Sequence, residues 1–402
     1  MKIKLFTLIA LLVSFVSCHQ DYGHKTVISI PVYGQSLALG EEATRITNFD
    51  SLANYANGRI VTERLDHDYG FFDNNTTKQL VKRMVNYDKR SFELTVYSMA
   101  EMLADSIGED TLICIFPGGQ GTTAIAQLGK GSEPYQKFID DIKTAYDAAI
   151  ERGWDFVMPA LCWMQGESDI EEYPGTDYRQ LLLQFVNDIN QDVKQMAGQQ
   201  QDIEIICYQT NPVSRARDFN PLAFDCPETK VPQTLMELVR DNPMFHASGP
   251  TYPYDFAREA IHIDGNGQRQ HGRLVAQAAL DILRGHQQSR GILPITFEKQ
   301  DKEVIIRFNI PKPNLTFDTI QVKKVNNFGF SVITPDNRDI TQSVCIKDNN
   351  VYILCSERPD SCRIRYAING EKGKSGRLHG PRGNLRDSAG NWCWQFDMLL
   401  SE

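Results

Sequence analysis

"TVISIPVYGQSLALG", residues 26–40, joins an apolar, β-branched run to a turn built of small residues. The run at 26–32 predicts a buried strand, because an unbroken apolar stretch fits a strand covered on both faces. A strand that breaks at a small residue and continues into a helix presents one side chain at the carboxyl edge of the sheet. Open α/β folds place their active sites at this edge. We predict that Ser36 is that side chain.

Strands and helices alternate from residue 25 to about 288. Helical periodicity predicts a first helix near 92–103, a second that begins after a cap at Thr176 or Asp177, and a last helix at 267–283. This alternation predicts a doubly wound parallel sheet with helices on both faces. Further near-continuous apolar runs, each predicted to be a strand, lie at 111–116, 156–163 and 203–208.

The pattern changes beyond residue 288. Short alternating runs such as "EVIIRFNI" and "CRIRYAI", separated by turn residues, predict a small β-sandwich domain at 289–402. Trp392 and Trp394 alternate on one of its expected strands. Such a pair either binds carbohydrate or packs, one ring in the core and the other under the neighbouring domain, and we favour packing.

Net charge excludes one class of partner. The 402 residues carry a formal charge of -9 and contain no block of Lys and Arg, so a nucleic-acid partner is not expected. A small neutral molecule or a carbohydrate fits the composition better.

The first 24 residues predict export. Lys2 and Lys4 precede an apolar stretch that ends near "FVSC", where Cys18 lies as in a bacterial lipobox. We predict a lipoprotein signal peptide at 1–17, a lipidated Cys18 that anchors the chain to a membrane, and a tether at 18–24. The expected location is the periplasm, the outer membrane or the cell surface. The alternative is an ordinary secretory signal in which Cys18 has no role.

Eight cysteines remain after Cys18, and export permits disulfides. A bridge that involves Cys345 or Cys355 is compatible with the hairpin expected there, whereas cysteines inside apolar strands are expected to be buried thiols. No cysteine pair or histidine cluster has metal-ligand spacing, so we predict neither a metal nor a cofactor.

A serine nucleophile needs an imidazole base and a carboxylate that orients the imidazole. "REAIHIDGNGQRQHG" places Glu259 three residues before His262, just ahead of the last helix of the α/β domain. Asp264 is a rival for the carboxylate, although we prefer it as the N-cap of that helix. His262 is preferred to His271, which lies inside the helix.

Four sequence blocks occur in the order and approximate spacing of SGNH-type hydrolases: "GQSLALG", "FPGGQGTTAIAQL", "WMQGESD" and "EAIHIDGNGQRQHGRLVAQA". Across residues 25–288 the chain most resembles the carbohydrate-esterase branch that contains sialate O-acetylesterases and acetylxylan esterases. The resemblance implies an SGNH, flavodoxin-like α/β domain.

The resemblance also implies roles for individual residues. Ser36 is the expected nucleophile, His262 the base and Glu259 the acid. The expected oxyanion hole consists of the amides of Ser36 and Gly121, with Gly119 as the alternative glycine, and the side chain of Gln165. Two departures from the family pattern are Leu37, where Asn is common after the serine, and Glu259, where Asp is usual.

The expected function is that of an exported serine esterase that removes O-acetyl groups from a polysaccharide or sialic acid through an acetyl-enzyme. Alternatives are a lipase or thioesterase on the same scaffold, and a lipid-anchored polysaccharide-binding protein whose hydrolase domain is inactive. Two further segments have two interpretations each. Residues 163–169 and the aromatic stretch 245–256 either contact substrate or brace the loops around the site.

Overall fold

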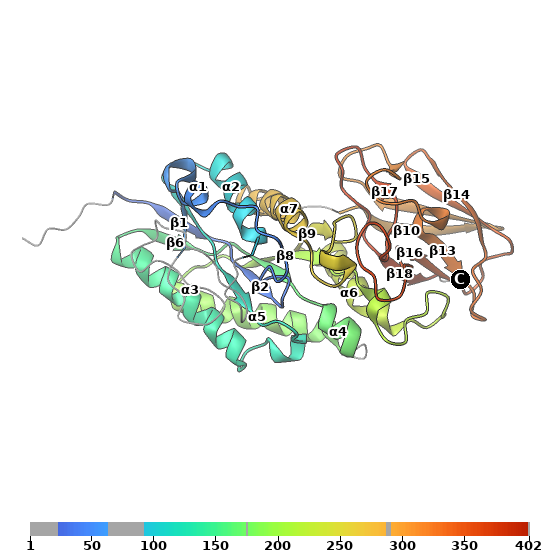
Figure 1. The fold of residues 1–402 in the computed structure, drawn as a ribbon, viewed down its shortest axis with the longest axis horizontal. Coiled ribbons are helices and arrows are strands. Elements are labelled where there is room, and N and C mark those ends of the chain that lie inside the picture. The colour runs from blue at the N-terminus through green and yellow to red at the C-terminus, as the bar shows by residue number, and fades with distance from the viewer. Residues whose placement is uncertain (1–22, 63–91, 174–175, 287–290, 401–402) are drawn as a thin grey trace, which may run out of the picture.

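A computed structural model of the chain describes residues 23–62, 92–173, 176–286 and 291–400. In Figure 1 an α/β domain, coloured from blue to yellow, lies beside an orange-red domain of strands. The change of architecture follows the last helix, as the sequence predicts. The signal peptide, the Cys18 anchor and most of the tether lie outside the described residues.

All strands of the α/β domain are parallel. The first long strand is interrupted after four residues, so it is described as β1 and β2, and the next two long strands are divided in the same way. Hydrogen bonds across the interruptions, such as Ile30 N to Cys114 O at 3.2 Å and Val32 N to Phe116 O at 3.1 Å, join the two halves into one sheet. Its two parts have the orders β3-β4-β1-β6 and β5-β2-β7-β8-β9. The strands are β1 (Thr26–Ser29), β2 (Val32–Gly34), β3 (Ile60–Val61), β4 (Thr111–Cys114), β5 (Pro117–Gly119), β6 (Asp155–Val157), β7 (Ala160–Met164), β8 (Glu204–Gln209) and β9 (Phe245–Pro250).

Helices cover both faces of this sheet. Buried side chains of α2 and α7 form one apolar cluster with the strands, and those of α3, α5 and α6 form another. The doubly wound α/β prediction is therefore confirmed. Asp177 caps α5, as one of the two predicted caps, by accepting a hydrogen bond from Gln180 N at 3.2 Å. The helices are α1 (Phe49–Ala53), α2 (Thr95–Ser106), α3 (Glu133–Glu151), α4 (Glu167–Glu172), α5 (Tyr178–Ala197), α6 (Lys230–Asp241) and α7 (Gly265–Leu283).

The C-terminal domain consists of antiparallel sheets. One has the order β10-β11-β15-β14, another β13-β16-β18, and β12 pairs with β17. The predicted all-β region is confirmed. Its strands are β10 (Leu293–Gln300), β11 (Glu303–Asn309), β12 (Thr316–Phe317), β13 (Phe330–Ile333), β14 (Thr341–Lys347), β15 (Asn350–Cys355), β16 (Arg363–Tyr366), β17 (Leu385–Arg386) and β18 (Phe396–Leu399).

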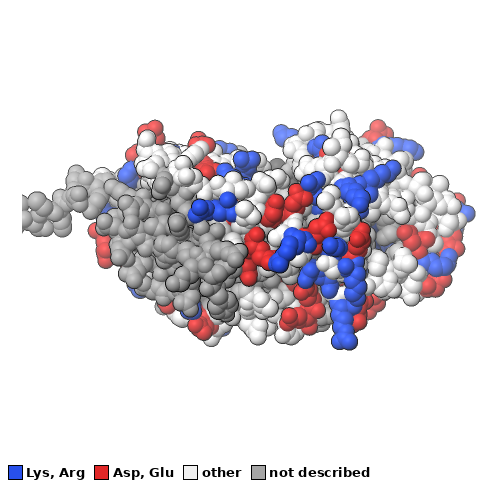
Figure 2. All heavy atoms as spheres, in the orientation of Figure 1, with Lys and Arg blue, Asp and Glu red and all other residues white. Residues whose placement is uncertain are grey.

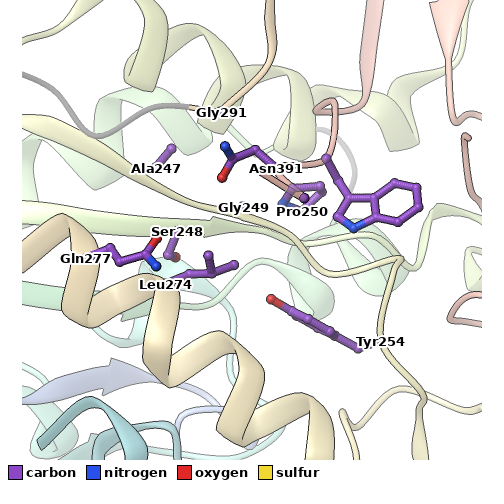
Figure 3. Close-up of a pocket in the computed structure, with 11 residues that line it drawn as sticks. Ala247, Ser248, Gly249, Pro250, Tyr254, Leu274, Gln277, Gly291 and Asn391 are labelled. Carbon is purple, nitrogen blue, oxygen red and sulfur yellow. The ribbon is translucent and has the colours of Figure 1, made fainter. Parts of the chain in front are cut away.

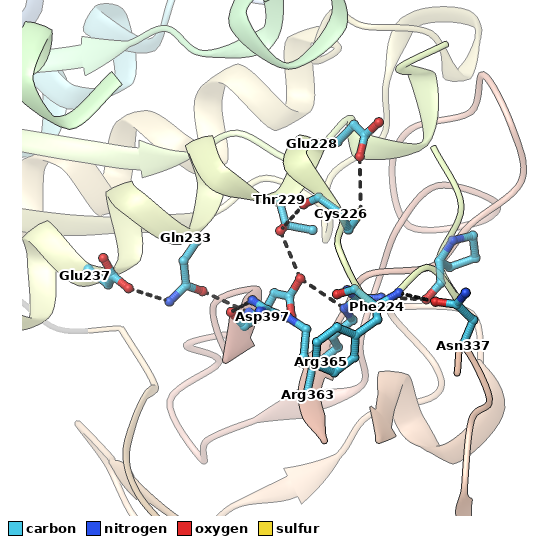
Figure 4. A network of polar contacts seen from close by, with 11 residues as sticks. Phe224, Cys226, Glu228, Thr229, Gln233, Glu237, Asn337, Arg363, Arg365 and Asp397 are labelled. Atoms are coloured by element: carbon cyan, nitrogen blue, oxygen red, sulfur yellow. Dashed lines mark hydrogen bonds and ion pairs between the residues drawn. The ribbon is translucent and has the colours of Figure 1, made fainter. Parts of the chain in front are cut away.

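The two domains share a buried boundary. The apolar cluster on the α3, α5 and α6 face continues into the β domain without a break. At the polar part of the boundary (Figure 4), the fully buried Arg365 pairs with Asp397 at 3.0 Å and donates to the carbonyls of Pro221 and Phe224 at 3.0 and 2.9 Å. Asp397 also accepts from Thr229 Oγ1 at 3.0 Å. Because charged and apolar groups are both buried here, the domains form one packed unit.

Trp392 and Trp394 pack inside the molecule rather than forming an exposed carbohydrate platform. Trp394 is fully buried, and the ring of Trp392 lies edge-on to Tyr252 of the α/β domain with centroids 6.0 Å apart. This is the arrangement that the packing interpretation predicts.

Cysteines and apolar helices give no sign of a cross-link or a membrane span in the described part of the chain. The eight described cysteines are unpaired, and Cys345 is the exposed one, so the disulfide expected at Cys345 or Cys355 is not formed. Among the same residues, no helix combines the length and the hydrophobicity needed to cross a bilayer.

Candidate active site

Ser36 follows β2 because glycine is the residue that fits the end of this strand. A Cβ on Gly34 would lie 1.9 Å from Met164 O of the neighbouring strand, so a larger residue cannot occupy the position. Gln35 then fixes the turn, since its amide donates to Met164 O at 3.1 Å and its side-chain oxygen accepts from Gly166 N at 3.3 Å. The order Gly-Gln-Ser therefore ends a central strand and leaves Ser36 at its carboxyl edge, as predicted.

Ser36, His262 and Glu42 form one hydrogen-bonded chain. His262 Nε2 lies 2.8 Å from Ser36 Oγ, and His262 Nδ1 lies 2.7 Å from Glu42 Oε2. Side-chain exposure is 13 % for His262 and 28 % for Glu42. An imidazole held between a hydroxyl and a carboxylate can remove the hydroxyl proton while the carboxylate stabilises the imidazolium that results.

Glu259 does not contact His262 in this structure, contrary to the sequence expectation. Arg258 and Glu259 both have left-handed backbone conformations, with φ of 55° and 51°, which turn the tip of the loop away from His262. The Glu259 carboxylate lies 2.7 Å from His379 Nδ1 and 3.2 Å from Lys374 Nζ of the β domain. The carboxylate on His262 is instead Glu42.

Asp264 has the role we preferred for it. Its Oδ1 accepts a hydrogen bond from Gly267 N at 2.7 Å, which makes it the N-cap of α7.

Glu42 was missed because nothing in its local pattern marks it. "GEE" at 40–42 reads as a polar turn after the serine block. The turn closes back on the serine, since Glu41 N donates to Ser36 O at 3.0 Å, and Glu42 adopts φ 61°. Two acidic residues so soon after a strand-end serine were the available signal.

Two backbone amides are suited to stabilise an oxyanion. A Cβ on Gly121 would lie 3.6 Å from Ser36 Cβ, so this glycine lies directly beside the hydroxyl. Neither Ser36 N nor Gly121 N donates to another group in the part of the chain that the structure describes. Gly119, the alternative, is packed into β5 against Gly34, where its Cβ would lie 1.8 Å from Gly34 O. The geometry therefore favours Gly121.

Gln165 is buried and fully engaged. Its Nε2 donates to Thr123 O at 3.1 Å and to Asp169 Oδ2 at 2.6 Å, and its Oε1 accepts from Tyr178 O–H at 2.8 Å. An amide nitrogen has two hydrogens, and both have acceptors here. Gln165 thus braces the loop that carries Gly121, and its oxyanion role stays a prediction that requires one of these bonds to be exchanged.

Burial of the other residues in 163–169 agrees with a bracing role. Glu167 accepts from Thr210 Oγ1 at 2.7 Å and from the Tyr208 hydroxyl, and burial raises its pKa to about 7. Asp169 accepts from Ile125 N at 3.0 Å, and burial likewise raises its pKa. Both side chains are buried, so they support the loop rather than line an open surface.

The stretch 245–256 is also structural in large part. Its first half is β9, a buried parallel strand that sequence inspection did not identify, because Gly249 and Pro250 interrupt its apolar pattern. Tyr252 is buried, and its hydroxyl donates to Cys393 O of the β domain at 2.8 Å. Figure 3 shows a pocket lined by β9 residues, Tyr254, residues of α7 and Asn391, but Ser36 and His262 do not line it.

Electrostatics leave His262 neutral at neutral pH. Burial lowers its pKa, and the charges of Arg215 and Arg258 act in the same direction, whereas Glu41 opposes them. His271 is buried more deeply and has its pKa lowered to about 3, with Ser248 Oγ at 2.8 Å and Thr95 Oγ1 at 3.2 Å from its ring nitrogens. His262 is therefore the imidazole that is both free to accept a proton and in contact with Ser36.

A serine, an imidazole and a carboxylate joined in this order at the carboxyl edge of a parallel sheet define a serine hydrolase of the α/β class. Residues 89–281 match a family model described as carbohydrate esterase, sialic acid-specific acetylesterase. The α/β domain thus carries the carbohydrate-esterase domain that the sequence blocks indicate, and the chain is a carboxylic ester hydrolase. The match begins after the segment that contains Ser36 and Glu42.

Solved structures share this fold. A carbohydrate acetylesterase from Xanthomonas citri superposes with a TM-score of 0.63 at 14 % identity, over 93 % of this chain and 80 % of that one. NanS has a TM-score of 0.42 at 17 % identity, over 66 % of this chain and 99 % of its own. A protein from Arabidopsis thaliana has a TM-score of 0.46 at 16 % identity, over 64 % of this chain and 98 % of its own. A comparison with curated proteins found no match.

Proposed function

We propose that the chain is an exported serine esterase that removes O-acetyl groups from carbohydrate, with Ser36, His262 and Glu42 as its catalytic triad. The observation that carries this proposal is the pair of hydrogen bonds that links Ser36 Oγ through His262 to Glu42. The carbohydrate-esterase match supports the class of substrate.

The first half of the reaction acylates the enzyme. Ser36 Oγ attacks the acetyl carbonyl carbon while His262 Nε2 takes the hydroxyl proton, and the amides of Ser36 and Gly121 donate to the carbonyl oxygen as it becomes negative. The bond between the carbonyl carbon and the sugar oxygen then breaks. His262 gives its proton to the sugar oxygen, which leaves as a hydroxyl.

The second half releases acetate. A water molecule attacks the acetyl-enzyme and loses a proton to His262, and that proton returns to Ser36 Oγ when the ester bond breaks. Glu42 stays ionised throughout and stabilises the imidazolium that forms in each half. The sequence of steps needs no metal or cofactor.

Turnover of a small aryl acetate and of acetylated polysaccharides tests this proposal. We expect rapid acetate release that Ser36→Ala abolishes, with a mass increase of one acetyl group on the wild-type chain during rapid-quench turnover. Folded wild-type protein with no turnover between about pH 6 and 9 would indicate the binding-only alternative. Preference for long acyl chains over acetyl would indicate a lipase or thioesterase.

Export is a separate part of the proposal and rests on the first 18 residues of the sequence. Lipidation of Cys18 would hold an otherwise soluble enzyme at a membrane. Cys18→Ser should release the protein into the soluble fraction or leave it unprocessed. A variant that is cleaved normally and stays in the membrane fraction would rule out the lipid anchor.

A further inference from the structure

His262 lies on a hairpin that closes just before α7. The hairpin spans residues 255–264: Asp264 N donates to Asp255 O at 3.0 Å, Ala257 N donates to His262 O at 2.8 Å, and Phe256 bridges Ile263. We call it the His262 hairpin. Its other elements leave the side chain of His262 facing Ser36, so its placement decides the geometry of the triad.

A segment of the β domain, residues 373–379, docks along this hairpin. Two backbone bonds join them: Ser375 N donates to Glu259 O at 2.9 Å, and Arg377 N donates to Tyr254 O at 3.2 Å. We call residues 373–379 the docking segment. Figure 2 shows Lys, Arg, Asp and Glu side chains intermixed on the visible face near the meeting of the two domains.

Ion pairs join the same two segments. Arg377 contacts Asp255 at 2.7 Å, and the tip residue Glu259 is held by His379 at 2.7 Å and by Lys374 at 3.2 Å. The pKa of Glu259 is lowered by His379 first and by Lys374 as well. Glu259, three residues from His262, therefore belongs to the contact between the domains.

Gly376 brings the docking segment against the hairpin. It has φ 83°, and a Cβ there would lie 2.9 Å from both Phe256 Cδ2 and Tyr254 O. Glycine is required by conformation and by space. Gly373, in the same segment, has a similar φ of 78° but no atom within 4 Å of its Cβ position.

The start of the docking segment is fixed to a second loop of the α/β domain. Gly373 N donates to Ser214 O at 3.0 Å, Ser214 Oγ donates to Lys374 O at 2.7 Å, and Arg215 donates to Gly373 O at 3.1 Å. The docking segment thus bridges the loop at 214–215 and the hairpin that carries the base.

We propose that the docking segment positions His262, so that the β domain is part of the catalytic unit rather than a separate module. The inference rests on the proposed function of Ser36 and His262. Glu259, His379 and Gly376 are its positioning residues: they touch no reacting atom, and they act by fixing the hairpin. Small displacements of a catalytic base cost large factors in rate, because proton transfer requires hydrogen-bond geometry.

The glycine pair gives a matched test. Gly376→Ala and Gly373→Ala introduce similar backbone strain in one segment, but only the first displaces the hairpin. We expect Gly376→Ala to lower kcat for an aryl acetate about 10-fold with little change in KM, and Gly373→Ala to lower it less than about 2-fold. The rate at which Ser36 Oγ displaces fluoride from an alkyl fluorophosphonate should fall in parallel, because that reaction needs the same base but no substrate site.

The ion pair gives a second, gentler test. Glu259→Gln and His379→Gln should each lower kcat by about 3- to 10-fold, and the double variant should be no slower than the slower single variant, since the two residues act through one contact. Asp155→Asn, which breaks the exposed His24–Asp155 pair of 2.9 Å, is the matched control and should leave kcat unchanged.

The outcomes separate this inference from the proposed function. Equal kcat and equal fluorophosphonate rates in the two glycine variants, or additive losses in the Glu259 and His379 double variant, would overturn the positioning role. If Gly376→Ala does not fold, the ion-pair series decides alone. An active Ser36→Ala variant would instead overturn the proposed function, whatever the positioning variants do.

Discussion

Glu42 Oε2 lies 2.7 Å from His262 Nδ1, on the edge of the imidazole opposite to Ser36. The nucleophile and the acid thus come from one turn of nine residues after a central strand, and the base comes from a loop 220 residues further along the chain. A single strand-end turn therefore supplies two members of the triad and, through the Ser36 amide, part of the oxyanion hole.

The neutral state of His262 predicts the acid limit of activity. Burial lowers its pKa from the ordinary 6.5, so the imidazole stays unprotonated and able to accept a proton as the pH falls through 6.5. We expect kcat/KM to stay level down to about pH 6.5 and to fall only below it. The measurement is a pH profile with a small aryl acetate, whose ester does not titrate. A midpoint above 7 would show that the carboxylates around His262 outweigh its burial.

Gln165 distinguishes bracing from oxyanion binding. The contacts with Thr123, Asp169 and Tyr178 predict that Gln165→Ala lowers the melting temperature and gives a mixed change in kcat and KM. A direct donor to the oxyanion would instead lower kcat by about 10²–10³ with KM nearly unchanged. Steady-state kinetics and thermal melts of the variant decide between them. Gln165→Glu sharpens the result, because a folded variant with near wild-type kcat excludes the side chain from the oxyanion hole.

The buried Asp397 predicts a large stability effect at the domain boundary. Asp397→Ala leaves Arg365 charged and fully buried without its partner, and we expect a loss of about 3–5 kcal/mol in the free energy of unfolding. Denaturant unfolding followed by tryptophan fluorescence measures it. Asp336→Ala, which removes the partner of the exposed Arg338, is the control and should shift the midpoint little. Equal midpoints for the two variants would be incompatible with a packed boundary.

Local sequence patterns predicted those parts of the molecule that local physics decides. Apolar runs predicted the parallel strands, and the Gly-Gln-Ser turn predicted Ser36 at a strand end. His262 followed from its position before the last helix and from the block pattern, and Asp264 from its fit as a cap.

The errors concern contacts between distant segments. Glu259 was assigned to His262 from a spacing of three residues, but the left-handed tip of the hairpin and the cations of the β domain direct it elsewhere. The contact of Glu42 with His262 depends on the whole sheet having formed, so no local pattern contains it. β9 was hidden because its glycine and proline resemble a loop.

The identity of the acid is the central claim, and parallel measurement of kcat for Glu42→Gln and Glu259→Gln tests it most directly. Glutamine keeps the size of each side chain but removes its charge, so a residue that orients His262 loses the correct tautomer, at a cost of about 10³–10⁴ in kcat. We predict this loss for Glu42→Gln and a loss of no more than about 10-fold for Glu259→Gln, with both variants folded. A Glu42→Gln enzyme with near wild-type kcat beside an inactive Glu259→Gln enzyme would contradict the account.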